Sequence, residues 1–411
     1  MAQPPRLWNF VASMADMTGL HILIVPAWWP SPEQPTAGVF FRDYALAYAD
    51  AGARVGVIFP NLVSFRHLGR SLVPIVPRIE REFLCKDIPV IRIRGLHTAL
   101  GSPSLQMWRY RSWLKRGLEA YRSLHGQPDV IHAMCSIPAG WACTTLRDEL
   151  ASRVVMTEHF GPFSAQMTRN SGESLVREAV SKAAEVVTVS ERSREDMERF
   201  ELGREILVCG NPVAREFLEA PLPAVTRKGP IRGLFVGRLS VEKGIRELVE
   251  AAITTSIEHN VEWHFVGGGE RQSWVMGRFD SWGRSAGVRF HGELPRERVV
   301  EEMIVADFLV LPSYGETFGM VVAEALCIGL PVIVTSGTGC EEFVDSSNGR
   351  LVDIGSVESL RSELTFMIEH ARAFDRIALS KHARSRFSHH AFLSFYSAIF
   401  RQVIDKSTER T

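Results

Sequence analysis

Residues 311–335, LPSYGETFGMVVAEALCIGLPVIVT, carry the most information about the fold of the second half of the chain. It begins with an apolar strand that ends at Pro312 and continues through a glycine-bearing turn into a helix, expected to begin near Thr317. A second apolar strand follows at residues 331–335. Strand, helix and strand in this order predict a β-α-β unit of a parallel sheet.

The expected helix start is suited to an anion. The N–H groups of Phe318, Gly319 and Met320 are predicted to face outward, and the helix dipole favours phosphate there. Glu316 and Glu324 are eight residues apart, so their backbones lie at most about 12 Å apart along the axis. This spacing favours one carboxylate on a sugar and the other on a ribose, with phosphates between them.

Glu324 also fits an ordinary helix-surface glutamate. Its apolar neighbours argue against full exposure, and an ionised carboxylate at an apolar rim needs hydroxyl or charged donors. We therefore favour the binding interpretation for Glu324.

A second motif, GRLSVEKG at residues 237–244, follows a strand and precedes a helix. Arg238 and Lys243 bring two cations to the carboxyl end of that strand, where they suit a diphosphate whose charge grows during bond cleavage. The alternative is a solvated loop with two exposed basic residues.

A glycine triplet follows the next strand, in VGGGE at residues 266–270. Gly267 and Gly268 allow main-chain N–H groups to approach a nucleotide, although a triplet also fits a tight turn. His291-Gly292 is equally well explained as a capped strand end.

The first half of the chain offers two candidates. Gly38, in the turn PTAGVFF at residues 35–41, has room to admit a substrate before a helix. His159 ends a strand that begins near Val154. A lone histidine is more often structural, so its interpretation as a partner of sugar hydroxyls depends on the nucleotide-sugar features of the other half.

The same alternation of apolar strands and amphipathic helices extends along the chain and predicts an α/β fold. Expected helices include residues 40–51, 173–184, 245–257 and 391–404. The expected strands are residues 21–26, 54–59, 89–93, 130–132, 154–158, 186–190, 206–209, 233–237, 263–266, 288–291, 308–312 and 331–335.

A proline-rich break divides this pattern into two Rossmann-like domains, which we expect to face each other across a cleft. Residues 1–18 are read as an N-terminal extension and residues 19–212 as an acceptor-binding domain. Residues 213–230 are the linker and residues 231–385 the nucleotide-sugar-binding domain. Residues 386–411 are expected to form a final helix that packs back on the first domain.

Composition excludes several classes. The 411 residues contain 47 Lys plus Arg and 47 Asp plus Glu, which argues against a nucleic-acid or polyanion binder. No apolar run approaches the roughly 20 residues that span a bilayer, so we expect a soluble protein. The six cysteines include no C-x-x-C pair and fit small buried side chains in a reducing cytosol.

Charge is uneven along the chain. Residues 61–122 hold twelve Lys or Arg against four acids, with Trp108, Tyr110, Trp113 and Leu114 interleaved. This pattern fits a docking surface, for anionic lipid or for a lipid-diphosphate acceptor. It fits equally well a solvated helix with ordinary core aromatics.

Taken together, these motifs resemble those of the GT-B fold glycosyltransferases of family 4, a large retaining family. The E-x7-E pattern from Glu316 to Glu324 is the most specific match, and GRLSVEKG is the next. VGGGE, His291-Gly292 and GNPV at residues 210–213 agree in order and spacing. The resemblance covers nearly the whole chain beyond residue 18.

The resemblance implies roles for the matching residues. Arg238 and Lys243 would stabilise the donor diphosphate, Glu316 the sugar hydroxyls and Glu324 the ribose hydroxyls, while His159 would contact the donor sugar. The remaining donor-binding positions that it implies are Gly38, Gly237, Gly267, Gly268, Thr317, Phe318, Gly319 and Met320. One departure is Ala37-Gly38, where the family often has a glycine pair.

The resemblance further implies front-face attack with retention of configuration, in which the departing phosphate helps to take the acceptor's proton. No cofactor is expected beyond the nucleotide-diphosphate sugar, and because no D-x-D motif occurs, we expect activity without a divalent metal. The expected enzyme is cytoplasmic, with contact at the inner face of the plasma membrane a further option. Its expected role is the transfer of a hexose-type sugar to a glycan or lipid-linked acceptor of a bacterial surface polysaccharide.

Other classes remain open at this point. An epimerase or hydrolase of the same fold would process the donor without a second sugar. A dinucleotide oxidoreductase is disfavoured because no G-x-G-x-x-G follows an early strand. A non-catalytic relative is disfavoured while Arg238, Lys243, Glu316 and Glu324 are all present.

Overall fold

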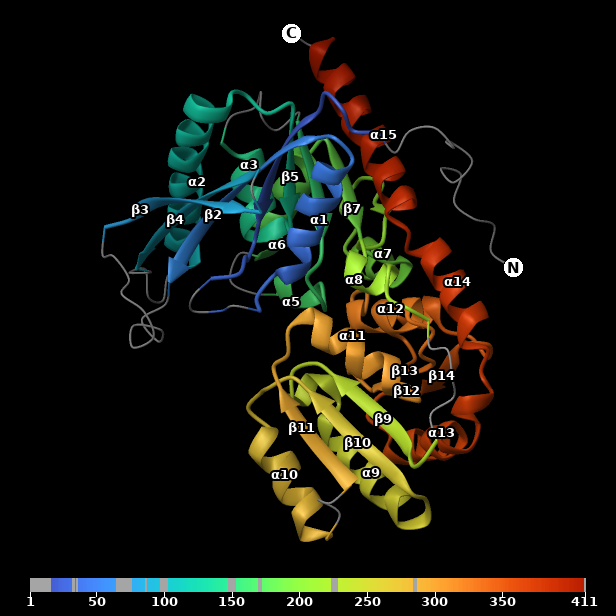
Figure 1. The fold of residues 1–411 in the computed structure, drawn as a ribbon. Helices are drawn as coiled ribbons and strands as arrows, with labels where there is room; N and C mark the ends of the chain where they lie inside the picture. Colours follow the sequence, from blue (N-terminus) through green and yellow to red (C-terminus); the bar gives the residue numbers. More distant parts are fainter. Residues whose placement is uncertain are drawn as a thin grey trace. The chain divides into compact units, whose positions relative to one another are not determined.

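A computed structural model describes residues 16–31, 34, 36–63, 76–85, 87–96, 103–146, 153–168, 172–222, 228–283 and 287–409. The chain forms two compact units (Figure 1). Unit 1 is Met1–Pro212 together with His389–Thr411, and unit 2 is Val213–Ser388.

Unit 1 is built on one sheet with the strand order β3-β4-β2-β1-β5-β6-β7-β8. All neighbouring strands pair in parallel except β3, which pairs antiparallel with β4 at the edge. The strands are β1 (His21–Pro26), β2 (Arg54–Val63), β3 (Arg78–Leu84), β4 (Ile88–Leu96), β5 (Val130–Met134), β6 (Val154–Glu158), β7 (Glu185–Thr188) and β8 (Leu207–Val208).

Both faces of this sheet are covered, as the continuous apolar strands require. Along β1, Ile22 and Ile24 belong to the apolar cluster that includes α1 and α15, while Leu23 and Val25 belong to the cluster that includes α2 and α3. The helices of unit 1 are α1 (Val39–Asp50), α2 (Pro103–His125), α3 (Trp141–Thr144), α5 (Ser164–Met167), α6 (Gly172–Lys182), α7 (Glu191–Glu198) and α15 (His389–Thr408).

The last helix, α15, is part of unit 1. The Tyr396 hydroxyl lies 2.9 Å from Thr157 Oγ1 on β6, and Thr157 Oγ1 lies 2.7 Å from Nε2 of His132 on β5. The packing of Tyr396 and Phe400 against the His132 ring adds aromatic contacts at 4.9 and 5.5 Å. These buried contacts fix the C-terminal segment on the first domain.

Unit 2 is an all-parallel sheet with the order β11-β10-β9-β12-β13-β14. From β9 the chain moves outward to β10 and β11, and from β12 it moves outward in the other direction. The loops after β9 and β12 therefore diverge, which makes their junction a topological switch point. The strands are β9 (Ile231–Val236), β10 (Val261–Val266), β11 (Val288–Gly292), β12 (Phe308–Leu311), β13 (Val332–Thr335) and β14 (Gly349–Val352).

Helices connect these strands. A short 3-10 turn at Val241–Lys243 precedes α9. The helices of unit 2 are α8 (Arg215–Leu218), α9 (Ile245–Glu258), α10 (Gln272–Ser281), α11 (Arg296–Val305), α12 (Met320–Cys327), α13 (Val357–His370) and α14 (Arg376–Arg386).

The structure confirms the predicted α/β class with two Rossmann-like domains. Two strands were not predicted: β3, whose residues are mostly charged and partly exposed, and the short β14. The break at residues 213–230 contains α8, and residues 223–227 of it lie outside the described residues. Among the described helices, none combines the length and apolar character needed to cross a bilayer.

Five of the twelve basic residues of region 61–122, together with Trp108, Tyr110, Trp113 and Leu114, lie on α2. Tyr110, Trp113 and Leu114 are buried core residues, whereas Trp108 keeps 59% of its surface exposed. Residues 64–75, 86 and 97–102 of this region lie outside the described residues.

Candidate active site

The predicted donor residues of unit 2 gather at the switch point. β9 and β12 are neighbours, with Phe308 opposite Gly233 and Leu309 opposite Leu234. The two loops that follow them are joined by a hydrogen bond of 2.9 Å from the Tyr314 N–H to the Glu242 carbonyl oxygen. A Cβ atom at Gly244 would lie 1.9 Å from the Pro312 oxygen, so only glycine permits this approach.

Lys243 and Glu316 meet across this junction. Lys243 Nζ donates to Glu316 Oε1 at 2.5 Å, and the Ser313 hydroxyl donates to the same oxygen at 2.8 Å. The side chains of Lys243 and Glu316 expose 25% and 14% of their surface, so solvent screens this ion pair only in part. The ion pair holds the Lys243 ammonium in place where the loops after β9 and β12 meet.

Arg238 provides the second cation. Its guanidinium donates to Glu242 Oε1 at 2.5 Å, and its side chain is 65% exposed. Burial opposes ionisation of Glu242, but hydrogen bonds from its own N–H and from Ser240, together with the charge of Arg238, hold its pKa below the usual value. Arg238 is therefore accessible to an anion, and its counter-charge sits four residues further along the same loop.

The glycine loop after β10 lies directly beside the β9 loop. The Gly237 N–H donates to the Val266 oxygen at 2.9 Å, and the Leu239 N–H donates to the Gly268 oxygen at 2.8 Å. A Cβ atom at Gly267 would lie 2.1 Å from the Gly237 oxygen. The backbone of Gly267 thus packs closely on that of Gly237, whereas a Cβ atom at Gly268 would meet only ordinary contacts, the nearest at 3.7 Å.

The helix after β12 begins later than we predicted. The expectation of a start near Thr317 is wrong: Gly319, at φ 78°, is the cap, and α12 begins at Met320. Thr317 and Phe318 belong to the loop, where a Cβ at Gly339 would lie 2.0 Å from the Thr317 oxygen. Within the described part of the chain, the N–H groups of Met320 and Val321 have no backbone acceptor, as expected for a first helical turn.

The side chain of Phe318 points away from this N–H edge. It is 2% exposed and packs against Phe343 at 4.8 Å. On α12, Met320, Val321 and Glu324 keep partial exposure, while the neighbouring Val322, Ala323 and Ala325 are buried. Glu324 therefore lies on the same accessible face as the helix start.

In unit 1, Gly38 caps α1 at φ 66°. A Cβ atom there would lie 2.6 Å from the Trp28 oxygen and 2.7 Å from Trp28 Cδ1. The glycine is therefore required by the fold of the loop after β1, whatever else it contacts.

His159 follows β6 and is buried, with 6% of its surface exposed. Its ring lies 5.0 Å from Phe41 and 5.4 Å from Phe40, both on α1, so the structure brings it to the helix that Gly38 caps. Burial lowers the pKa of His159 to about 3, which keeps the imidazole neutral at physiological pH.

Glu158 holds the His159 loop, and sequence reasoning missed it. Its Oε1 accepts the N–H groups of His159 and Phe160 at 2.9 and 2.8 Å. Its Oε2 accepts the N–H and hydroxyl of Ser136 at 2.9 and 2.5 Å. A carboxylate after an apolar strand was the available signal, although nothing in the sequence names its four donors.

Ser313 and Glu242 were also missed. Each lies inside a quoted motif, but its contact partner depends on the adjacency of β9 and β12. A cavity of about 290 Å³ elsewhere in unit 2 is lined by residues that include Phe343, His382 and Arg386. It contains none of the predicted donor residues.

Two Rossmann-like domains, one of which carries cations and open N–H groups at a switch point, are those of a GT-B glycosyltransferase. The chain matches the family model described as Glycosyltransferase Family 4 at residues 37–217 and that described as Glycosyl transferases group 1 at residues 223–386. The chain belongs to the GT-B glycosyltransferases of family 4.

Relatives agree with that assignment. The chain is 27% identical over 359 residues to TuaC of Bacillus subtilis, whose name assigns it to teichuronic acid biosynthesis, covering 84% of this chain and 88% of TuaC. The fold resembles sucrose-phosphate synthase from Thermosynechococcus elongatus, with a TM-score of 0.70 at 19% identity over 95% and 98% of the two chains. Anabaena HepE in complex with UDP is similar, with a TM-score of 0.64 at 17% identity over 95% and 100%.

Proposed function

We propose that this protein is a retaining glycosyltransferase that moves a hexose-type sugar from a nucleotide-diphosphate donor to a glycan or lipid-linked acceptor in bacterial surface polysaccharide biosynthesis. The observation that carries the proposal is the Lys243–Glu316 pair, held at the β9 and β12 switch point beside the open first turn of α12. The name of TuaC and the UDP bound to HepE support the pathway and the donor class.

Lys243 and Arg238 would stabilise the leaving diphosphate. An ammonium group has three N–H donors. One donates to Glu316, which leaves two for phosphate oxygens and fixes their direction. As the bond between the anomeric carbon and the phosphate oxygen breaks, negative charge grows on the diphosphate, and fixed cations and N–H groups stabilise that charge more than the ground state.

Glu316 and Glu324 would hold hydroxyl groups. Both described contacts of the Glu316 carboxylate reach Oε1, so Oε2 is positioned to accept a hydroxyl of the donor sugar. Glu324, on the accessible face of α12, would accept the ribose hydroxyls. Gly237, Gly267 and Gly268 carry no side chain and would let the nucleotide approach the main chain.

Retention follows if the acceptor attacks from the side that the diphosphate leaves. The acceptor oxygen bonds to the anomeric carbon, the phosphate takes the bonding electrons, and a phosphate oxygen accepts the acceptor's proton. This route needs strong cations and no carboxylate nucleophile. In unit 1, Gly38 is proposed to contact phosphate, and neutral His159 is proposed to hydrogen-bond a sugar hydroxyl without adding charge.

The first experiment is a thermal-shift screen against UDP, GDP, ADP and their sugars, followed by product analysis with the best donor. Transfer to a glycan or lipid-linked acceptor with retained configuration supports the proposal. Release or isomerisation of the sugar without transfer would instead indicate a hydrolase or epimerase. Lys381→Ala on α14, an exposed lysine outside the site, is the matched control for Lys243→Ala.

Turnover is proposed to need no divalent metal, because the cations of the site are side chains. A chelator should leave the transfer rate unchanged. Loss of all turnover in chelator that manganese restores would contradict this part of the proposal.

We further propose that the enzyme works in the cytoplasm and docks on the inner face of the plasma membrane through α2. Trp108 and Leu105 expose 59% and 43% of their surface, and Lys115 and Arg116 are exposed on the same helix. Vesicles with anionic lipid should float with the wild-type chain, while Trp108→Ala should weaken flotation and Lys381→Ala should not. Equal flotation with neutral and anionic vesicles, or none with either, would remove this docking surface.

A further inference from the structure

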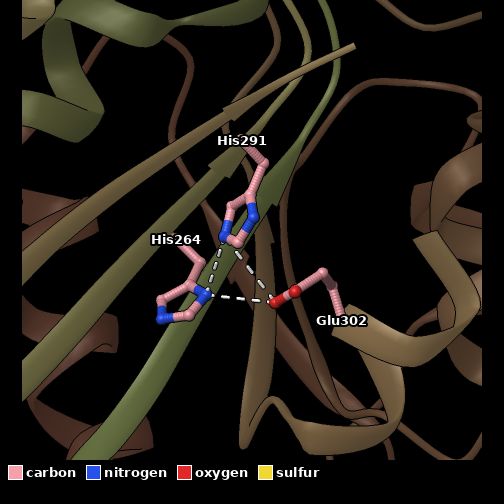
Figure 2. A group of neighbouring side chains, drawn as sticks. All are labelled: His264, His291 and Glu302. Atoms are coloured by element: carbon pink, nitrogen blue, oxygen red, sulfur yellow. Dashed lines mark hydrogen bonds and ion pairs between the residues drawn. The ribbon is translucent and has the colours of Figure 1, made fainter. Parts of the chain in front are cut away.

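A group of side chains outside the donor site converges on one point in unit 2. His264 on β10, His291 on β11 and Glu302 on α11 point toward one another (Figure 2). Nδ1 of His264 lies 3.0 Å from Nε2 of His291 and 3.1 Å from Oε2 of Glu302. Nε2 of His291 lies 3.7 Å from the same Glu302 oxygen.

These spacings match the edges of a metal coordination shell. Zinc binds imidazole nitrogen and carboxylate oxygen at about 2.0–2.1 Å in tetrahedral geometry, so two ligand atoms lie about 3.3–3.4 Å apart. The three observed separations of 3.0, 3.1 and 3.7 Å bracket that value. All three involve the same set of atoms, one from each residue, as a single ion requires.

Hydrogen bonds alone satisfy this triangle poorly. Neutral imidazole offers one N–H and one lone pair, on different nitrogens. If Nδ1 of His264 carries the proton, one hydrogen must serve both Glu302 and His291. If it does not, two acceptors face each other at 3.1 Å. A cation at the centre would accept a lone pair from each of the three atoms.

The fold presents these ligands in a way that suits an ion. The register between β10 and β11 shifts between Phe265 and Val266, so His291 is the extra residue of β11, and such bulges re-aim side chains. The His264 side chain is 3% exposed, while those of Glu302 and His291 keep 13% and 21%. The buried histidine anchors the group, and the other two leave a path for entry.

We propose that His264, His291 and Glu302 bind a Zn²⁺ ion, with water in the fourth position. Two histidines and one carboxylate form a ligand set that zinc uses in proteins. The ion would tie β10, β11 and α11 together. Because the transfer reaction is assigned to other residues, chelation should lower stability while leaving turnover at ordinary temperature in place.

The test uses the full chain without an affinity tag and with Cys85→Ser, since Cys85 is an exposed free thiol that can bind metal. Metal-free protein is titrated with Zn²⁺ against a chromophoric chelator, and Co²⁺ is added separately as a spectroscopic probe. We expect one ion per chain, a raised melting temperature and the visible absorption of four-coordinate Co²⁺. His291→Ala and Glu302→Gln should each weaken binding by about 100-fold or more.

Glu301→Gln is the matched control, because Glu301 is the neighbouring residue on α11 and its side chain is 56% exposed. His370→Ala serves the same purpose for the histidine, which exposes 50% of its side chain. Zinc that binds equally well to His291→Ala and Glu302→Gln, or fails to bind the parent protein, would overturn the proposal. Zinc affinity, melting temperature and Co²⁺ absorption are all measured without sugar transfer. The outcome of this test is therefore independent of the outcome of the test of the proposed function.

Discussion

Replacement of Lys243 by Met separates the two roles that the structure gives this residue. The substitution keeps the aliphatic stem and removes the ammonium that donates to Glu316 at 2.5 Å. Glu316 exposes only 14% of its side chain and would retain only the Ser313 hydroxyl among the described donors to its carboxylate. A partly buried carboxylate without its counter-charge costs about 1–3 kcal/mol of unfolding free energy.

That cost predicts a measurable loss of stability. In a domain of this size about 1 kcal/mol lowers the melting temperature by roughly 2–4 °C, so Lys243→Met should melt several degrees lower. Glu316→Gln should behave similarly, because it leaves the ammonium unpaired. The double variant should recover most of the loss, since removal of both charged partners is nearly neutral.

Activity should follow a different pattern. Loss of a fixed group that stabilises transition-state charge lowers kcat by about 10²–10³-fold. The double variant should therefore regain stability but remain as inactive as Lys243→Met. Calorimetry and initial rates with the donor found by the thermal-shift screen measure the two effects, with Lys381→Ala as control. If the double variant recovers both stability and turnover, Lys243 acts only on the fold and the proposed site is wrong.

The other predictions concern the loops, the buried histidine and the ribose contact. Gly244→Ala should destabilise unit 2 by about 2 kcal/mol or more in urea melts, because Gly244 has a φ of 64° and its new Cβ atom would overlap the Pro312 oxygen. The control is Gly277→Ala within α10, where nothing lies within 4 Å of the new Cβ atom, and this variant should be neutral or stabilising. The pKa of His159 falls to about 3 in the folded state, so the unfolded chain binds one more proton between pH 3 and its usual value near 6.5. This contribution to stability is complete above pH 6.5 and is lost at about 1.4 kcal/mol per pH unit as the pH falls. Urea melts at pH 7 and pH 5 should therefore show a smaller loss of stability for His159→Gln than for the wild-type protein. An equal loss in the variant and the wild type would contradict this prediction. Glu324→Gln should weaken nucleotide binding by about tenfold in titration calorimetry, whereas Glu258→Gln on the exposed end of α9 should not, and equal affinities would remove the ribose contact.

Much of the architecture was predictable because parallel strands covered on both faces are continuously apolar. β1 and β6 begin and end where the sequence predicts them, and the bounds of the four helices for which a range was predicted differ by at most four residues. β3 escaped prediction because RIEREFL lacks the apolar run of a buried strand. It is held by antiparallel pairing with β4 and by the Glu82–Arg92 ion pair at 2.5 Å, which depend on the neighbouring strand.

The start of α12 was misplaced for a similar reason. Nothing local prevents a helix from beginning at Thr317, but the close approach of Gly339 to the Thr317 oxygen holds that residue in the loop. The positive φ of Gly319 then sets the first helical residue at Met320. Tertiary packing, rather than helix propensity, sets the boundary.

Local sequence is sufficient to show that glycine-bearing loops with Arg238, Lys243, Glu316 and Glu324 follow apolar strands, because periodicity and turn chemistry are local properties. The position of β12 beside β9, which joins Lys243 to Glu316 across 73 residues, is visible only in the folded chain. It also brought His264 to His291 and Glu302, 27 and 38 residues away. Strand order and register arise from burial of whole sheet faces, and no short window of sequence contains that information.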